Sequence, residues 1–294
     1  MAMSFEFVTV HAHGPHVLEV RMDRPEKRNA MNPKMWKEMG ACFAAIADEP
    51  ACRAVLLTGA GKHFTAGIDL MGGGLGSVVG DSDGADVARR GLQILREGGK
   101  WQDAWSELER CGKPVIACVH GGCWGAGLEL IAAADIRFCS ADAFFQAPEV
   151  DIGLAADIGG NQRLPKIVGN ESLVRELMLS GRRMGAAEAK EFGLVSRVCA
   201  DRDDLLRQAG ELAAVIASKS PVATYGVKTL LNYTRDHTVD ESLRFALTWN
   251  AAMLQTTDVQ QAGQAFFTKQ PAVFENLIPL RGDAKQPLKV TSKL

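Results

Sequence analysis

The sequence predicts an α/β fold in which parallel strands are joined by helical crossovers. As far as Pro165, short apolar runs of strand length alternate with longer segments of helical spacing, and this alternation is typical of parallel sheets. Beyond Pro165 the segments are mostly helical. Apolar residues make up 47% of the 294 positions, which is enough for one large core or two small ones.

The N-terminal segments predict a hairpin, a helix and a buried strand. Residues 5–10 and 17–22 alternate apolar and polar positions on either side of a Gly-Pro pair, as in an edge hairpin. Residues 33–48 have helical spacing. The apolar run at 54–58 predicts a buried strand that ends in a Gly-rich turn.

The central segments continue the alternation. Residues 71–85 are rich in Gly, Ser and Asp, so we expect a mobile loop near the ligand. The helix predicted over 86–111 places Trp101, Trp105 and Leu108 on one face. Further strands are predicted at 115–119 and 136–139, with a helix opened by the Gly-rich turn between them.

The C-terminal part predicts helices at 186–192, 203–219 and 239–254. The last of these is amphipathic and offers a surface for association. No sequence repeat of fixed period interrupts this pattern.

Composition and charge exclude several classes of protein. A net charge of −2 provides no basic field for nucleic acid or an anionic membrane. The seven cysteines form no Cys-x-x-Cys pair and the six histidines no metal motif, so we expect reduced thiols and no metal site. The most apolar long window, residues 115–136, is broken by His120, glycines and Glu129, and predicts no membrane span.

The last three residues, Ser292-Lys293-Leu294, match the address that the peroxisomal import receptor reads. The start of the chain carries no export or mitochondrial signal. We therefore expect a location in the peroxisome or a related microbody, with the import receptor as a partner. A bacterial source would make the location cytoplasmic.

A Gly-rich turn is the first candidate for chemistry. In residues 121–129, glycines let the main chain approach a ligand, and a helix that begins near Gly125 directs unpaired amides outward. An enolate oxygen fits there, and Glu129 shares the same face of the helix. The alternative is a turn for tight strand–helix packing, with Glu129 in solvent. A second Gly-containing segment, residues 63–69, offers amides for the same oxygen.

Acids within apolar sequence are the second candidate. Glu149 and Asp157 lie among aromatic and aliphatic residues in the segment 144–160, and Asp151 is a third acid there. Burial raises the pKa of a carboxyl group toward neutrality, where it can take up and return a proton. The alternative is that these acids cap a loop or pair with Arg163.

These motifs resemble the crotonase (enoyl-CoA hydratase/isomerase) superfamily. The similarity covers residues 5–274, and its motifs occur in the expected order. They are Arg24-Pro-Glu-Lys-Arg-Asn-Ala-Met31, Phe64-Thr-Ala-Gly-Ile-Asp69, the Gly121 turn and Gln162-Arg-Leu-Pro165. Within the superfamily, residues 144–157, Ser218-Lys-Ser-Pro221 and residues 235–242 are similar to the delta(3,5)-delta(2,4)-dienoyl-CoA isomerases.

The resemblance implies a spiral of ββα units over residues 1–200. It also implies a helical region for oligomerisation at 201–280, a flexible tail with the targeting tripeptide at 281–294, and assembly into homotrimers or homohexamers. The substrate would be an acyl-CoA thioester, with no other cofactor. The amides of Ile68 and Ala126 would bind the thioester oxygen. CoA would contact Lys27, Arg28, Ala66, Ile68 and, from a C-terminal helix or a neighbouring subunit, Phe266 and Lys269.

The resemblance also implies roles for the acids in converting a 3,5-dienoyl-CoA to a 2,4-dienoyl-CoA during fatty acid β-oxidation. Asp157 would remove a proton from C2, Glu149 would deliver one at C6, and Glu129 would position or tune the pair. The sequence departs from animal dienoyl isomerases at position 129, where they carry Asp. Hydratases carry two glutamates that match Glu129 and Glu149, so 2-enoyl-CoA hydration is the alternative activity. A third hypothesis is a protein that binds acyl-CoA without catalysis, and the presence of three acids is evidence against it.

Overall fold

The structure is a computed structural model that describes residues 3–73, 84, 86–279 and 288–292. Its strands are β1 (Val8–Gly14), β2 (Val17–Met22), β3 (Ala54–Gly59), β4 (Val115–Val119), β5 (Gly122–Trp124), β6 (Ile136–Ser140), β7 (Phe144–Gln146), β8 (Arg183–Gly185), β9 (Arg197–Cys199) and β10 (Thr291–Ser292). Its helices are α1 (Pro33–Ala47), α3 (Val87–Arg110), α4 (Ala126–Ala132), α5 (Gly160–Val168), α6 (Glu171–Ser180), α7 (Ala186–Glu191), α8 (Arg202–Ala217), α9 (Pro221–Thr234), α10 (Val239–Met253) and α11 (Thr257–Thr268), with 3-10 turns η1 (Pro25–Lys27) and η2 (Pro148–Ile152).

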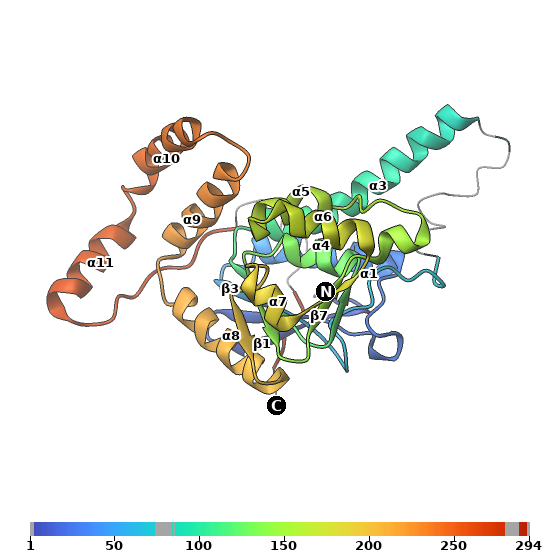
Figure 1. Ribbon diagram of the computed structural model, residues 1–294. Coiled ribbons are helices and arrows are strands. Elements are labelled where there is room, and N and C mark those ends of the chain that lie inside the picture. Colours follow the sequence, from blue (N-terminus) through green and yellow to red (C-terminus); the bar gives the residue numbers. More distant parts are fainter. Residues whose placement is uncertain (1–2, 74–83, 85, 280–287, 293–294) are drawn as a thin grey trace.

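Two sheets organise the core. The larger has seven strands in the order β10-β1-β2-β3-β4-β6-β9, and the smaller has the order β5-β7-β8. The predicted hairpin is confirmed, because β1 and β2 are antiparallel, whereas the strands from β2 to β9 pair in parallel. The order ββα recurs in β1-β2-α1, β4-β5-α4 and β6-β7-α5. The mixed α/β core and the helical C-terminal region are thus as predicted (Figure 1).

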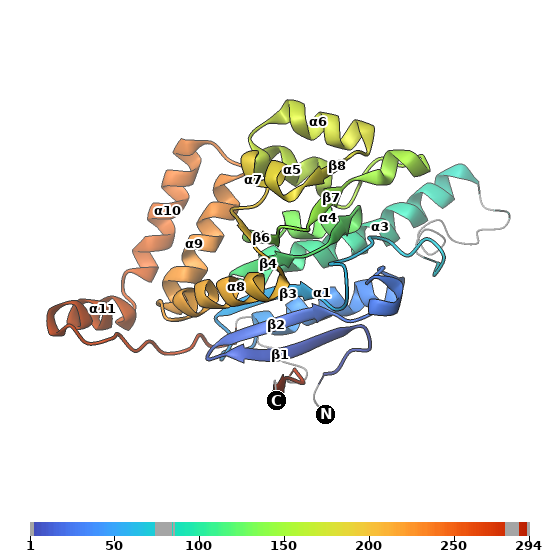
Figure 2. The same cartoon turned by 60° about the horizontal axis from the view of Figure 1, so that its bottom comes forward.

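The central strands of the larger sheet are buried on both faces. In β3, Val55 and Leu57 join the cluster that contains α1 and α3, and Leu56 joins the cluster on α8. This follows from the period of two in a strand, which alternates side chains between faces. Figure 2 shows α8 lying across the sheet on the second face.

A stack of three tryptophans fixes α3 to the core. The Trp36 ring stacks on those of Trp101 and Trp105, with centroids 4.5 and 3.8 Å apart. Trp36 Nε1 also donates to the Trp101 carbonyl oxygen at 3.1 Å. Trp101, Trp105 and Leu108 are buried, as the predicted apolar face requires. The part of α3 before Trp101 projects from the body (Figure 1).

The C-terminal helices form an arm beside the core. Helices α10 and α11 stand away from the sheets in both views (Figures 1 and 2), and α9 joins them to the core, where buried Lys228 donates to the Lys113 carbonyl oxygen and to Asp135. Each begins at a residue whose side chain caps it, and Thr238 and Glu241 form a complete capping box on α10. None of the described helices is both long and apolar enough to cross a membrane.

The chain returns to the sheet after α11. Arg53 donates to the Phe274 carbonyl oxygen at 2.6 Å and to Asn276 Oδ1 at 2.8 Å. Within the tail predicted to be flexible, Leu288 is buried and β10 pairs in parallel with β1. Most of the loop predicted at 71–85, and Lys293 and Leu294 of the targeting tripeptide, lie outside the described residues.

Candidate active site

The Gly-rich segment opens α4 at Gly125, as predicted, but its residues Gly122–Trp124 form strand β5, which was not predicted. Gly125 has φ +47° and ψ −117°, a conformation that a residue with a Cβ rarely adopts. A Cβ at Gly125 would also lie 2.7 Å from Glu149 Oε1, so the glycine leaves room for that carboxylate. Ala126 is the first residue of α4, and the first amides of a helix have no intrahelical acceptor. The Ala126 amide is therefore available to a ligand.

A second loop brings the Ile68 amide to the same place. Residues Met31 and Ile68 form a parallel bridge through the Gly67 carbonyl and the Asp69 amide, so the Ile68 amide points to the opposite side. Gly67 packs against the Gly-rich turn, because a Cβ on it would lie 2.8 Å from the Trp124 carbonyl oxygen and 3.6 Å from the Ala126 nitrogen. The two predicted amides are thus brought together.

Two polar residues that sequence reasoning left without a role hold this second loop. Asn29 is fully buried and donates through Nδ2 to the carbonyl oxygens of Ala60, His63 and Phe64 at 2.8 to 3.1 Å. Arg24 forms an ion pair of 2.6 Å with Asp69. The signal for Asn29 is weak in sequence, although Asn tolerates the positive φ of 55° that the turn needs.

Glu129 is buried beneath the turn. Its Oε1 accepts from the Gly160 amide at 2.8 Å and the Ile158 amide at 3.2 Å. A Cβ at Gly160 would lie 2.9 Å from the same oxygen, so this glycine permits the contact. Burial, together with the charges of Glu149 and Asp157, raises the pKa of Glu129 to about 8. The alternative of a solvated Glu129 is therefore wrong.

Glu149 lies in η2 against Gly125. Its Oε2 is buried and has no hydrogen-bond partner among the described residues. Burial and the charge of Asp157 raise the pKa of this carboxyl group. A proton on Glu149 is therefore retained closer to neutral pH than on an exposed glutamate.

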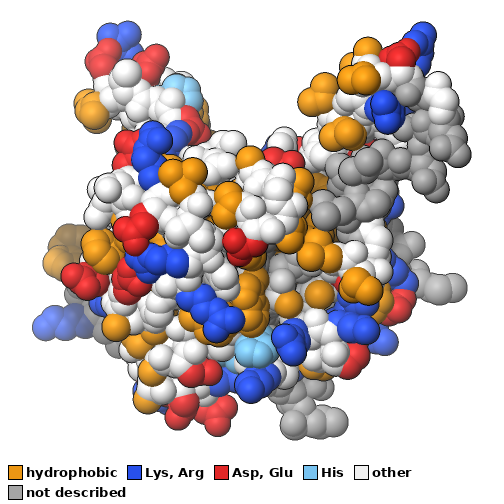
Figure 3. All heavy atoms as spheres, turned by 45° about the vertical axis from the view of Figure 1, so that its right-hand side comes forward, with side chains coloured by type: hydrophobic (Ala, Val, Ile, Leu, Met, Phe, Trp, Pro, Cys, Tyr) orange, Lys and Arg blue, Asp and Glu red, His pale blue; other side chains and the backbone are white. Residues whose placement is uncertain are grey.

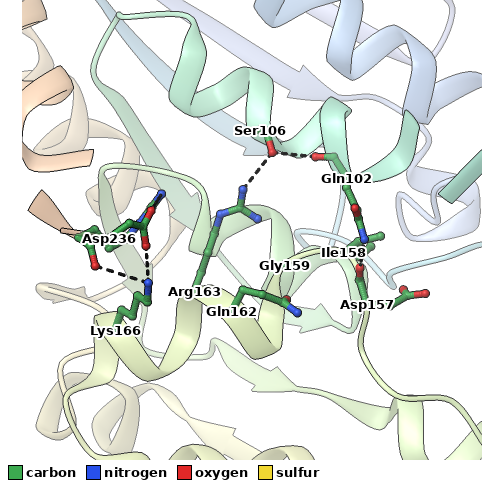
Figure 4. Close-up of a pocket in the computed structure, with 10 residues that line it drawn as sticks. Gln102, Ser106, Asp157, Ile158, Gly159, Gln162, Arg163, Lys166 and Asp236 are labelled. Atoms are coloured by element: carbon green, nitrogen blue, oxygen red, sulfur yellow. Dashed lines mark hydrogen bonds and ion pairs between the residues drawn. The ribbon is translucent and has the colours of Figure 1, made fainter. Parts of the chain in front are cut away.

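Asp157 differs from the expectation of a buried acid, because it is exposed in the single chain. Its neighbours Ala156 and Ile158 are buried, so its side chain turns outward between two that turn inward, and the preceding residues 151–155 are exposed as well. Pairing with Arg163, the alternative considered from sequence, does not occur. Arg163 binds Glu109 instead, with Nε 3.0 Å from Oε1. Figure 4 shows the Asp157 side chain directed away from Arg163 and Lys166.

The three acids lie close enough to affect one another. The charge of Asp157 contributes to the raised pKa of both Glu129 and Glu149. A pocket of about 380 Å³ borders the main chain at Asp157. It is lined by Gln102, Ser106, Asp157, Ile158, Gly159, Gln162, Arg163, Lys166, Arg235 and Asp236 (Figure 4).

Four of the residues implied in CoA binding lie together. Lys27 and Arg28 are exposed at η1, and the Ala66 amide, two residues before Ile68, donates to the Arg28 carbonyl oxygen at 2.8 Å. Figure 3 shows apolar side chains gathered in the middle of one face, with Lys, Arg and His side chains below them.

Phe266 and Lys269 lie elsewhere in the chain. Both are exposed, at the end of α11 on the arm, which stands on the opposite side of the core from α3 (Figures 1 and 2). A single chain does not bring them to the three acids. Among the residues that the structure describes, no group of His, Cys, Asp or Glu side chains could hold a metal ion.

Known proteins resemble this chain over most of its length. Residues 13–277 match the family model described as enoyl-CoA hydratase/isomerase. The chain is 51% identical over 267 residues to the mitochondrial Delta(3,5)-Delta(2,4)-dienoyl-CoA isomerase of Mus musculus, covering 91% of this chain and 81% of that protein. It is 39% identical to the peroxisomal protein of the same name from Arabidopsis thaliana, covering 89% and 93%. The crystal structure of an enoyl-CoA hydratase from Bacillus anthracis superposes with a TM-score of 0.82 at 28% identity, covering 92% and 99%.

Proposed function

The chain belongs to the enoyl-CoA hydratase/isomerase family, and on this premise we propose that it is a delta(3,5)-delta(2,4)-dienoyl-CoA isomerase. The name of the mouse relative supports this activity at 51% identity. The observation that carries the proposal is the state of Asp157, which lies beside Glu149 and Glu129 but forms no ion pair among the residues that the structure describes. A carboxylate in this position is available for proton transfer.

The proposed reaction removes one proton at C2, adds another at C6 and shifts three electron pairs. Asp157 removes a proton from C2 of the 3,5-dienoyl thioester, and the resulting dienolate places negative charge on the thioester oxygen. The amides of Ile68 and Ala126 stabilise that charge. Glu149 then delivers a proton to C6, which leaves double bonds at C2 and C4. The raised pKa of Glu149 suits it to donation near neutral pH.

Glu129 has a different role in this proposal. Its Oε1 accepts hydrogen bonds from two main-chain amides. We therefore propose that Glu129 holds in place the segment that carries Asp157. The proton that Asp157 acquires exchanges with water, since this side chain is exposed. Asp157 thus releases its proton to water, and Glu149 takes up a proton from water before the next turnover.

Hydration of a 2-enoyl-CoA is the second candidate activity. The raised pKa of both Glu129 and Glu149 favours it, because two such acids can activate a water molecule. Ultraviolet absorbance separates the two reactions. Isomerisation brings the diene into conjugation with the thioester and increases absorbance at long wavelength, whereas hydration removes a conjugated double bond.

The direct test uses purified enzyme with a 3,5-dienoyl-CoA. We expect an increase in absorbance with the native chain and a loss of at least about 1,000-fold in kcat for Asp157→Asn. The variant should keep its circular dichroism spectrum, because the Asp157 carboxylate forms no hydrogen bond or ion pair among the described residues and the substitution leaves the main chain unchanged. Near-full turnover in a folded Asp157→Asn variant would contradict the proposal.

We propose that CoA binds along Lys27, Arg28, Ala66 and Ile68 of one subunit, with Phe266 and Lys269 supplied by a neighbouring subunit of a homotrimer or homohexamer. The exposure of these two residues on α11 supports a contribution to another chain. The reaction as written balances without any cofactor beyond the CoA of the substrate.

We also propose a peroxisomal location. The Arabidopsis relative is named as peroxisomal, although the mouse relative is named as mitochondrial. The tripeptide Ser292-Lys293-Leu294 matches the peroxisomal address. Recognition by the import receptor requires this tripeptide at a free carboxyl end.

A further inference from the structure

We propose that Gln102 and Asn161 are positioning residues for Asp157, and that they act by holding the main chain on which its carboxylate depends. This inference rests on the proposed function, in which Asp157 takes the proton from C2. It adds two residues that act through Asp157 without touching the substrate.

Three side chains hold the two peptide groups on either side of the Asp157 Cα. Asn161 Nδ2 donates to the Ala156 carbonyl oxygen at 2.6 Å. Gln102 Nε2 donates to the carbonyl oxygen of Asp157 itself at 2.7 Å. Glu129 Oε1 accepts from the Ile158 amide at 3.2 Å. The three anchors come from α5, α3 and α4, so three helices converge on one short stretch of chain.

Main-chain anchoring matters here because the carboxylate has no anchor of its own. Among the described residues, no hydrogen bond or ion pair holds the Asp157 carboxylate, and the nearby Arg163 is held by Glu109. The segment between η2 and α5 also has no regular secondary structure. The position of the carboxylate is therefore set by the peptide groups on either side of it.

Gln102 joins this segment to the part of α3 that the tryptophan stack holds on the core. Trp101 is buried in the tryptophan stack, whereas Gln102 is exposed and reaches across to the main chain at Asp157 (Figure 4). The hydrogen bond runs between residues 55 positions apart in sequence. The tryptophan stack thus fixes this part of α3. The hydrogen bond from Gln102 then fixes the main chain at Asp157, the residue that accepts the proton.

The test uses substitutions of similar shape that remove only the donor. Gln102→Met and Asn161→Leu should each lower kcat for a 3,5-dienoyl-CoA by about 10-fold, because a small misplacement of a reacting group is costly. The double variant should lose about 100-fold. KM should remain within about twofold of the native value, because neither side chain is assigned to CoA. Gln162→Met is the matched control: the Gln162 side chain lines the same pocket but forms no hydrogen bond among the described residues, so kcat should not change.

A background of Asp157→Asn separates positioning from general damage. If the anchors act through Asp157, adding Gln102→Met or Asn161→Leu to Asp157→Asn should cause no further loss of residual turnover at high enzyme concentration. Equal losses in both backgrounds, or native kcat in both anchor variants, would overturn this inference while leaving the proposed function intact. Near-full turnover in Asp157→Asn alone would overturn the proposed function and this inference with it.

Discussion

The three carboxylates of the site differ in their hydrogen-bond partners. Glu129 accepts hydrogen bonds from two main-chain amides. Glu149 has one buried oxygen without a partner among the described residues, and Asp157 is exposed. A carboxylate that already accepts two hydrogen bonds is suited to holding structure. The other two acids are free to exchange protons. This division supports two proton-transferring residues and one that positions them.

Glu129 predicts a pH dependence of stability. Its pKa is about 8 in the folded chain, against about 4.3 for an unperturbed glutamate. Between these values the folded chain binds more protons than the unfolded chain. The free energy of unfolding should therefore fall as pH rises, by up to about 1.4 kcal/mol per pH unit from this group. Its stabilising contribution is complete below about pH 4 and is lost as pH passes 8.

Urea unfolding of the native chain and of Glu129→Gln measures this effect. The side-chain oxygen of Gln can accept the same two hydrogen bonds from main-chain amides, and Gln does not titrate. The stability of the native chain relative to the variant should decline from pH 5 to pH 8. Parallel curves over that interval would contradict the raised pKa of Glu129.

The candidate acids could be predicted from sequence, but their surroundings could not. Apolar neighbours indicated burial for Glu149 and Asp157, yet Asp157 is exposed because an irregular segment can turn one side chain outward between two buried ones. The role of Asn29 depends on contacts to residues 31 to 35 positions away. Such contacts exist only once the fold has formed.

Among the helices and strands, the start of α4 near Gly125 was predicted because closely spaced glycines mark a turn. The structure explains why position 125 must be glycine. Gly125→Ala should abolish detectable turnover and lower the free energy of unfolding by about 1–3 kcal/mol, because the Cβ would meet Glu149 and φ is +47°. Thermal unfolding and the isomerase assay measure both effects.

Gly263→Ala is the matched control for this substitution. Gly263 lies in α11 with nothing within 4 Å of its would-be Cβ. Alanine there should stabilise the chain by about 0.5–1 kcal/mol and leave turnover unchanged. Unchanged turnover in Gly125→Ala would exclude the role assigned to this turn.

Several short elements could not be predicted. Strands β5, β7, β8 and β9 have three residues each, and so short a run carries no usable period. Pro165 was the point beyond which the sequence predicted mostly helices, and it lies inside α5, a helix that was not predicted. The smaller sheet, which carries the turn and η2, therefore emerges only from the structure.

At the scale of the whole molecule, the arm of α9–α11 exposes apolar side chains. Leu243, Leu247 and Phe266 are 65%, 75% and 81% exposed. Single apolar residues on a surface are ordinary, but several on adjacent helices indicate contact with another chain. We expect Leu247→Asp to convert an oligomer to monomers, measured by light scattering during size-exclusion chromatography. A monomeric native chain would contradict the proposed assembly.

The layered core was predictable because strands buried on both faces are continuous apolar runs, as in β3 and β4. The position of the arm relative to the core could not be predicted. The periodicity of α10 indicates which side is apolar, but not what that side contacts.

Deuterium incorporation tests the central claim, proton transfer from C2 to Asp157 and from Glu149 to C6. A 3,5-dienoyl-CoA is converted in D2O, and the product is analysed by proton NMR. We expect deuterium at C6, loss of C2 exchange in Asp157→Asn, and C2 exchange without product in Glu149→Gln. Product without deuterium at C6, or C2 exchange that persists in Asp157→Asn, would contradict the account.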